Sequence, residues 1–139
     1  MVQSFDWRTL QLVQKLAPAI PTVYLSQQTG RAATVSLDKT SPWTAGFNPS
    51  EHGKSLPRTI KAAGGVVWSP YFGDVDPALI SECHWLGLAV VVWTVNKAAD
   101  MARMIDIGVD GIISDYPDLL RKIAGEKGIN LPRGAPVTP

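Results

Sequence analysis

The chain has 139 residues, of which 45% are hydrophobic and 18% charged, and its formal net charge is +1. That size and composition are typical of a single globular domain and argue against a disordered chain. A nearly neutral chain lacks the basic surface that nucleic acid or an anionic membrane requires, and no stretch approaches the roughly 18 apolar residues of a membrane span, so none of these partners is predicted.

The first elements read as a strand, a helix and a second strand. Residues 2–5 favour a strand, and the helix after them begins at Asp6 as its N-cap and ends before Pro18. Residues 22–25 form the second strand. Because the chain starts directly in a strand and without a signal-peptide pattern, we expect the natural protein to extend further upstream.

Residues 27–56 show no clear period and are interrupted by glycine and proline. Long loops in compact domains are often lids or site loops, although disorder or short hidden elements remain alternatives. Trp43 and Phe47 lie in this insertion. Their side chains either close over a site or anchor the loop to the rest of the domain.

The remaining chain alternates between helices and strands. We predict helices near 57–64, 77–86, 97–107 and 116–128, and strands at 66–69, 88–95 and 109–115. Asp76 and Asn96 precede two of these helices, and Asp115 lies just before the last one, so helix capping explains all three side chains. The strand at 88–95 is apolar at nearly every position, which predicts burial on both faces.

Five strands that alternate with helices predict an α/β fold with a parallel sheet. The sheet is either open and doubly wound or part of a closed barrel. No G-x-G-x-x-G motif or P-loop follows any strand, which weakens a nucleotide-binding interpretation.

The stretch GLAVVVWTVNKAADMARMIDIGVDGIISDYPD, residues 87–118, narrows the choice. It closely resembles the end of the glycerophosphodiester phosphodiesterase family, through Trp-Thr-Val-Asn at 93–96 and Gly-Val-Asp-Gly-Ile-Ile-Ser-Asp-Tyr-Pro at 108–117. The resemblance implies a partial (β/α)8 TIM barrel made of its last five βα units. Residues 1–125 would form this part of the barrel, with 27–56 as a loop insertion, and residues 126–139 a tail rich in proline and glycine.

The resemblance also implies a reaction. Family members hydrolyse glycerophosphodiesters to glycerol 3-phosphate and an alcohol with a divalent metal, Mg²⁺ or Ca²⁺, and their histidines, arginine and metal-binding carboxylates come from the first three strands. We find no equivalents here: His52 lies in the insertion and His84, in a predicted helix beside Cys83, reads as a partly buried structural residue. We therefore predict no catalytic residue, no metal ligand and no bound metal in this chain alone, which we expect to be inactive alone.

Four residues are candidates for the wall of a substrate pocket. Active sites of such barrels lie at the carboxyl ends of the strands, where this sequence places Gln3, Ser4, Phe5 and Trp93. Phe5 and Trp93 would pack against an apolar part of the substrate, and Gln3 or Ser4 would hydrogen-bond a phosphate or a glycerol hydroxyl. The alternative for Trp93 is an ordinary core position.

Two other functions stay open. One is a non-catalytic assembly or binding module that self-associates through the open sheet edges at Val2 and Val109. The other is a self-contained open α/β domain that binds a small anion at helix N-termini. The family reading differs from both because it requires a glycerophosphodiester substrate.

Overall fold

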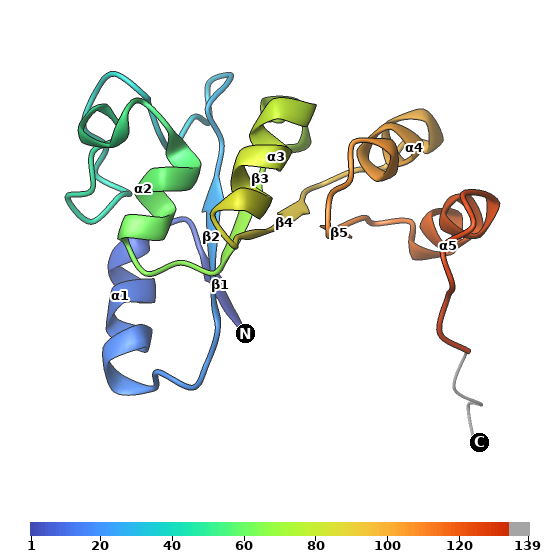
Figure 1. Ribbon diagram of the computed structural model, residues 1–139, viewed down its shortest axis with the longest axis horizontal. Helices are drawn as coiled ribbons and strands as arrows, with labels where there is room; N and C mark the ends of the chain where they lie inside the picture. The colour runs from blue at the N-terminus through green and yellow to red at the C-terminus, as the bar shows by residue number, and fades with distance from the viewer. Residues whose placement is uncertain (134–139) are drawn as a thin grey trace.

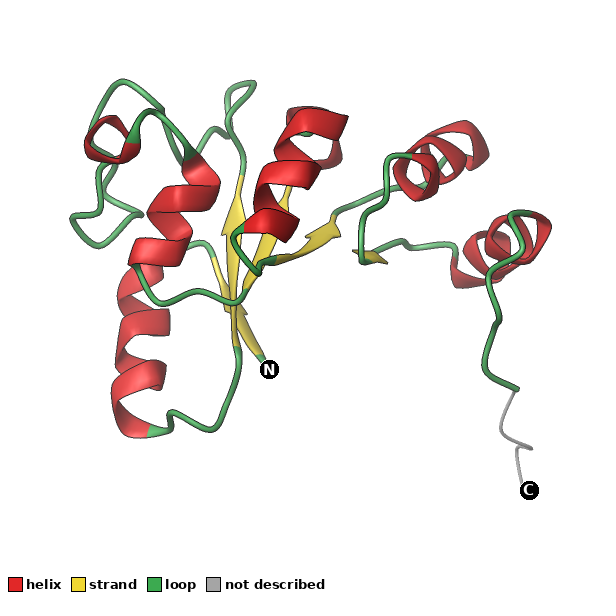
Figure 2. Ribbon diagram, viewed as in Figure 1, coloured by secondary structure: helices red, strands yellow, loops and turns green. Residues whose placement is uncertain are grey.

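The computed structural model describes residues 1–133 and shows alternating strands and helices (Figure 1; Figure 2). The strands are β1 (Val2–Ser4), β2 (Thr22–Ser26), β3 (Val67–Pro70), β4 (Ala89–Val92) and β5 (Gly111–Ile112), and the α-helices are α1 (Trp7–Leu16), α2 (Leu56–Ala62), α3 (Pro77–Trp85), α4 (Ala98–Asp106) and α5 (Pro117–Glu126). Two short 3₁₀ helices, η1 (Pro49–His52) and η2 (Phe72–Asp74), complete the described part. The predicted order of elements is confirmed.

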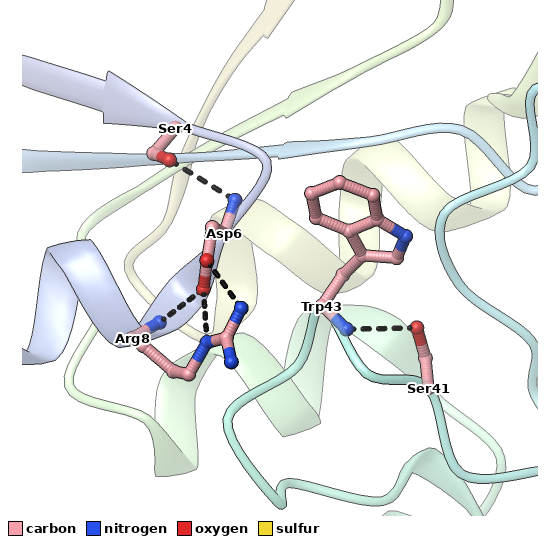
Figure 3. A network of polar contacts seen from close by, with 5 residues as sticks. All are labelled: Ser4, Asp6, Arg8, Ser41 and Trp43. Atoms are coloured by element: carbon pink, nitrogen blue, oxygen red, sulfur yellow. Dashed lines mark hydrogen bonds and ion pairs between the residues drawn. The ribbon is translucent and has the colours of Figure 1, made fainter.

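Local capping explains where several helices begin. Asp6 caps α1 by accepting a hydrogen bond from the backbone amide of Arg8 at 3.0 Å, and its carboxylate also accepts 2.6 Å and 2.8 Å hydrogen bonds from the Arg8 guanidinium (Figure 3). This guanidinium lowers the pKa of the Asp6 carboxyl. Asp76 caps α3 through the amide of Leu79 in the same way. Both caps were predicted, because a cap and its partner are neighbours in the sequence.

The strand order decides between an open sheet and a barrel wall. All neighbouring strands are parallel, and the sheet runs β1-β2-β3-β4-β5 in chain order. Crossovers between parallel strands are right-handed almost without exception, so an order that never reverses puts every crossover helix on the same face. In Figure 1 the helices accordingly follow one another around the outside of the sheet from α1 to α5. A doubly wound sheet needs a reversal of strand order, and this sheet has none in residues 1–133.

The core lies between the sheet and these helices. Tyr24 on β2 and Trp68 on β3 are register partners, and both are fully buried there. The Tyr24 hydroxyl contacts Gln11 and Gln14 of α1, and the Trp7 ring meets the Tyr24 ring edge-on at 4.9 Å between centroids. Side chains alternate along a strand, so the neighbours of Tyr24 and Trp68 point to the opposite, helix-free face.

The prediction that residues 88–95 are covered on both faces is wrong for the described chain. The β4 strand itself spans only Ala89–Val92; Val90 and Val92 are completely buried beneath the helices, whereas Ala89 and Val91 are partly exposed. Its apolar alternate positions therefore line a face that residues 1–133 leave partly open. This face is the concave interior of a barrel wall.

The insertion at 27–56 is anchored to α1. Phe47 packs against Trp7 with ring centroids 6.4 Å apart, and the Trp43 carbonyl accepts a hydrogen bond from the Trp7 backbone amide at 2.9 Å. The Trp43 indole itself stays 41% exposed beside the Asp6 turn (Figure 3). The insertion contains η1 as its hidden element, capped by Asn48.

No helix in the described residues is both long and apolar enough to cross a membrane. The predicted tail begins inside the end of α5, which reaches Glu126, and residues 134–139 lie outside the described part.

Candidate functional site

A hollow opens on the helix-free face at the carboxyl ends of the strands. It has a volume of about 210 Å³ and is lined by Gln3, Phe5, Leu25, Trp93, Thr94 and Ile113. Phe5, Trp93 and Ile113 each follow a strand directly, after β1, β4 and β5. The lining thus combines segments far apart in the sequence, and it occupies the end of a parallel barrel where ligands bind.

The apolar wall of the hollow is a pair of aromatic rings. Phe5 meets Trp93 edge-on, with centroids 5.4 Å apart and an interplanar angle of 89°. Trp93 is fixed further because its indole nitrogen donates to the Ser69 carbonyl at 2.9 Å, and the Tyr71 ring lies 5.8 Å from it. An edge-on aromatic pair contributes about 1 kcal/mol beyond area burial. These contacts give the wall a defined shape before any ligand arrives.

The two predicted polar wall residues are placed differently. Gln3 is exposed and lines the hollow, on the same face of β1 as Phe5. Ser4 lies between them and does not line it; its hydroxyl instead accepts a hydrogen bond from the Asp6 amide at 3.0 Å (Figure 3). The structure therefore brings Gln3, Phe5 and Trp93 together and leaves Ser4 in the turn before α1.

The predicted caps at Asn96 and Asp115 are wrong. The N-caps of α4 and α5 are Lys97 and Tyr116, and neither helix has a side-chain cap. Asn96 instead donates from Nδ2 to Asp115 Oδ2 at 2.8 Å, and its Oδ1 accepts from the Asp115 amide at 3.0 Å and the Ser114 hydroxyl at 3.2 Å. These bonds join the loops after β4 and β5, beside Trp93, Thr94 and Ile113 of the hollow.

The histidines lie away from the hollow. His84 was expected to be partly buried, which is wrong: its side chain is exposed on α3 and contacts Asp110 at 3.0 Å. Asp110 also accepts from the Val90 amide at 2.7 Å, so this contact ties α3 to the start of β5 at the opposite end of the sheet. His52 is the last residue of η1 within the insertion and does not lie at the end of a strand.

The cations near His52 are paired with carboxylates. Lys54 contacts Asp38 at 2.6 Å, and Arg58 contacts Glu82 at 2.7 Å. The Lys54 pair raises the pKa of its ammonium group and lowers that of Asp38. Both cations are more than half exposed, and neither lines the hollow.

The described residues do not fit a divalent cation. Within 1–133, no three His, Cys, Asp or Glu side chains are grouped so that they could hold a metal ion. Cys83 is fully buried on α3, and burial raises the pKa of its thiol to about 12. A group that is protonated and covered offers neither a ligand nor a nucleophile.

The comparisons with known proteins point to one family. The model of the glycerophosphoryl diester phosphodiesterase family matches residues 1–119. A glycerophosphodiester phosphodiesterase of Bacillus altitudinis is 30% identical over 126 residues, which cover 91% of this chain and 43% of that protein. One from Bacillus subtilis is 29% identical over 125 residues, covering 88% of this chain and 36% of the relative. The chain thus spans less than half the length of these relatives.

Solved structures agree on the fold. A Silicibacter pomeroyi protein assigned to the glycerophosphoryl diester phosphodiesterases superposes on this chain with a TM-score of 0.76 at 40% identity, covering 91% of this chain and 38% of the other. A glycerophosphodiester phosphodiesterase from Parabacteroides distasonis superposes with a TM-score of 0.66 at 23% identity, covering 91% of this chain and 43% of the other. These neighbours are TIM barrels, so the predicted partial barrel is confirmed.

Proposed function

The chain belongs to the glycerophosphoryl diester phosphodiesterase family, and from this premise we propose that it forms the substrate-binding wall of an enzyme that hydrolyses glycerophosphodiesters to glycerol 3-phosphate and an alcohol. The observation that carries the proposal is the hollow lined by Gln3, Phe5 and Trp93 at the carboxyl ends of the strands. The site residues proposed from the sequence thus gain support from their placement, except Ser4.

The wall would orient the carbon part of the substrate. The Phe5 and Trp93 rings offer an apolar surface to the glycerol carbons, and the two rings already hold each other edge-on. The Gln3 side chain is exposed at the same hollow, and its amide can donate to a phosphate oxygen or exchange hydrogen bonds with a hydroxyl. Fixing the substrate in one orientation removes rotational freedom before the reaction.

Phosphodiester hydrolysis needs more than this wall. Charge on the phosphoryl oxygens must be neutralised, and the leaving alkoxide must receive a proton, usually from a histidine. The described residues do not fit the metal that the family implies, and His52 and His84 lie away from the hollow. We propose that this chain alone is inactive and that residues of a further segment complete the site.

The sheet edges are where such a segment would join. β1 and β5 each pair with one neighbour in the described sheet. Beside β5, an apolar hollow of about 240 Å³ lies between α4 and α5 and is lined by Ile105, Val109, Ile112, Leu120, Ala124, Ile129 and Leu131 among others. Unpaired edges invite strand addition. Self-association through the same edges is the competing outcome, whereas the purely non-catalytic module is not favoured by relatives named as phosphodiesterases.

The test is release of glycerol 3-phosphate from glycerophosphocholine, with Mg²⁺ and then with Ca²⁺. The chain is assayed alone and mixed with a separately expressed segment that carries the first three strands of a family member's barrel. We expect activity in the mixture and none from either part. The matched control is the mixture with Trp93→Ala, which removes the aromatic wall and should raise KM more than it lowers kcat.

Other outcomes would redirect the proposal. Metal-dependent activity from the chain alone would contradict its inactivity and would send attention to Asp115 and the two histidines. A chain that elutes as a dimer in size-exclusion chromatography, and stays inactive in the mixture, would favour self-association through the edges.

A further inference from the structure

The loops after β4 and β5 are joined by one side chain at the rim of the hollow. The Asn96 amide oxygen accepts two hydrogen bonds, from the Asp115 backbone amide and the Ser114 hydroxyl, and its nitrogen donates to the Asp115 carboxylate. We propose that Asn96 is a positioning residue, which fixes the width of the hollow by holding the loop of Ile113 against the loop of Trp93. This inference rests on the proposed function, because it gives the hollow a substrate to fit.

The need for such a residue follows from the weakness of the sheet at this edge. β5 has two residues, and its register with β4 consists of Val91↔Gly111 and Val92↔Ile112. Beyond those pairs, the backbone adds a bond from the Ile113 amide to the Val92 carbonyl at 2.8 Å and one from the Val95 amide to the Ile113 carbonyl at 2.9 Å. A short edge strand opens easily, and the Asn96 bonds continue the junction past its end.

The chemistry of the junction requires an amide at position 96. Asn96 presents acceptor and donor on one planar group: the oxygen meets two donors and the nitrogen meets a carboxylate. Aspartate has the same shape but can only accept when ionised, so Asn96→Asp would place two carboxylates about 2.8 Å apart at the Asp115 contact. Exchanging the pair, Asn96→Asp with Asp115→Asn, restores a donor opposite every acceptor.

The test is amide hydrogen exchange measured by NMR on the full chain. Each lost hydrogen bond makes local opening easier, so we expect Asn96→Asp to speed exchange of the Val95 and Ile113 amides by about tenfold. The Ala63 amide, which bonds the Thr59 carbonyl at the end of α2 and away from this junction, serves as the control and should not change. The exchanged pair should return both rates to near the wild-type values. Ser114→Ala is the milder variant, with a smaller acceleration at the same two amides.

A second readout connects the junction to the hollow. Glycerol 3-phosphate is titrated into the chain while the Trp93 indole N–H resonance is followed, since this group is held by the Ser69 carbonyl. We expect Asn96→Asp to weaken binding by about tenfold, as one misplaced wall contact does, and the exchanged pair to restore it. The exchange rates and the titration are independent, so each can fail by itself.

Three results would overturn the inference. Unchanged exchange at Val95 and Ile113 in Asn96→Asp would show that the side chain does not hold the loops. Equal acceleration at Ala63 would assign Asn96 to the stability of the whole domain. An exchanged pair that recovers its exchange rates but not its affinity would mean that the Asp115 carboxylate contacts the ligand directly. If the Trp93 indole resonance of the wild type does not shift when glycerol 3-phosphate is added, the proposed function fails. The exchange rates still decide the role of Asn96 in that case.

Discussion

Two adjacent buried aromatic residues should respond very differently to loss of their polar atom. Tyr24 and Trp68 are register partners with no exposed surface, and each becomes phenylalanine in the test. The Tyr24 hydroxyl makes hydrogen bonds with the Ala63 carbonyl at 2.8 Å, Gln11 at 2.8 Å and Gln14 at 3.0 Å. Each of these three partners retains another hydrogen bond when the Tyr24 hydroxyl is removed. Gln11 also bonds the Ala63 carbonyl, and Gln14 also bonds Thr22 and the Gly64 carbonyl.

No buried group is therefore stranded by Tyr24→Phe, and we expect a loss of about 1 kcal/mol in the free energy of unfolding, not the roughly 3 kcal/mol that adding the separate bonds gives. Trp68→Phe differs because the indole nitrogen donates to the Ser26 hydroxyl at 2.8 Å, and Ser26 is fully buried. An orphaned hydroxyl together with a smaller side chain should cost about 3 kcal/mol.

The measurement is urea unfolding followed by far-UV circular dichroism, which does not depend on the altered fluorophores. Ser26→Ala is the matched control in the Trp68→Phe background, where removal of the orphaned hydroxyl should recover about 1 kcal/mol. Equal losses for Tyr24→Phe and Trp68→Phe, or no recovery in the double variant, would refute the argument that shared partners protect the first site.

Three further outcomes follow from the titrating groups. Burial raises the pKa of the Tyr24 hydroxyl. The stability that the protonated hydroxyl contributes is therefore complete below the unfolded-state pKa of about 10, and it is lost as pH rises through the folded-state pKa. Urea midpoints measured across that pH range should fall in the wild type and fall less in Tyr24→Phe. The Cys83 thiol is buried, and its pKa is raised to about 12. It should therefore resist a thiol reagent at pH 8 in the native chain and react fully in urea. Fast labelling of the native chain would place the thiol at the surface. Asp6→Ala should lower the melting temperature at neutral pH because it removes the cap of α1. Since Arg8 lowers the pKa of the Asp6 carboxyl, the wild-type advantage should persist above the unfolded-state pKa of that carboxyl and disappear as pH falls through its folded-state pKa. A melting-temperature difference that does not depend on pH would argue against an ionised cap.

The residues predicted correctly from the sequence are those whose partners are close in the chain. Asp6 bonds an amide 2 residues away and Asp76 one 3 residues away, and both caps were evident from their position before a helix. Asn96 occupies the same kind of position, but its partner Asp115 lies 19 residues along the chain. Side-chain chemistry could not show that the loop after β5 competes successfully for that amide.

The candidate site was predictable to the extent that it depends on strand alternation. Gln3 and Phe5 share a face of β1 because they are two residues apart, and Trp93 was predicted close to the carboxyl end of its strand, although β4 ends at Val92 and not at residue 95. Ser4 is one residue from each of them and therefore points to the other face, where its hydroxyl accepts a hydrogen bond from the Asp6 amide. Leu25 and Ile113 were missed, since an apolar residue at a strand end carries no signal that separates a pocket wall from ordinary core.

The strand order has a consequence for the way the chain folds. Each of the five described strands pairs with the strand that precedes or follows it in the sequence, so every pairing closes a loop no longer than one crossover. The entropic cost of closing a loop rises only slowly with its length, so even the crossover between β2 and β3, which carries the insertion, adds little to the cost of that pairing. The sheet can therefore grow in the direction of synthesis, with each strand docking onto an edge that the preceding unit has already built.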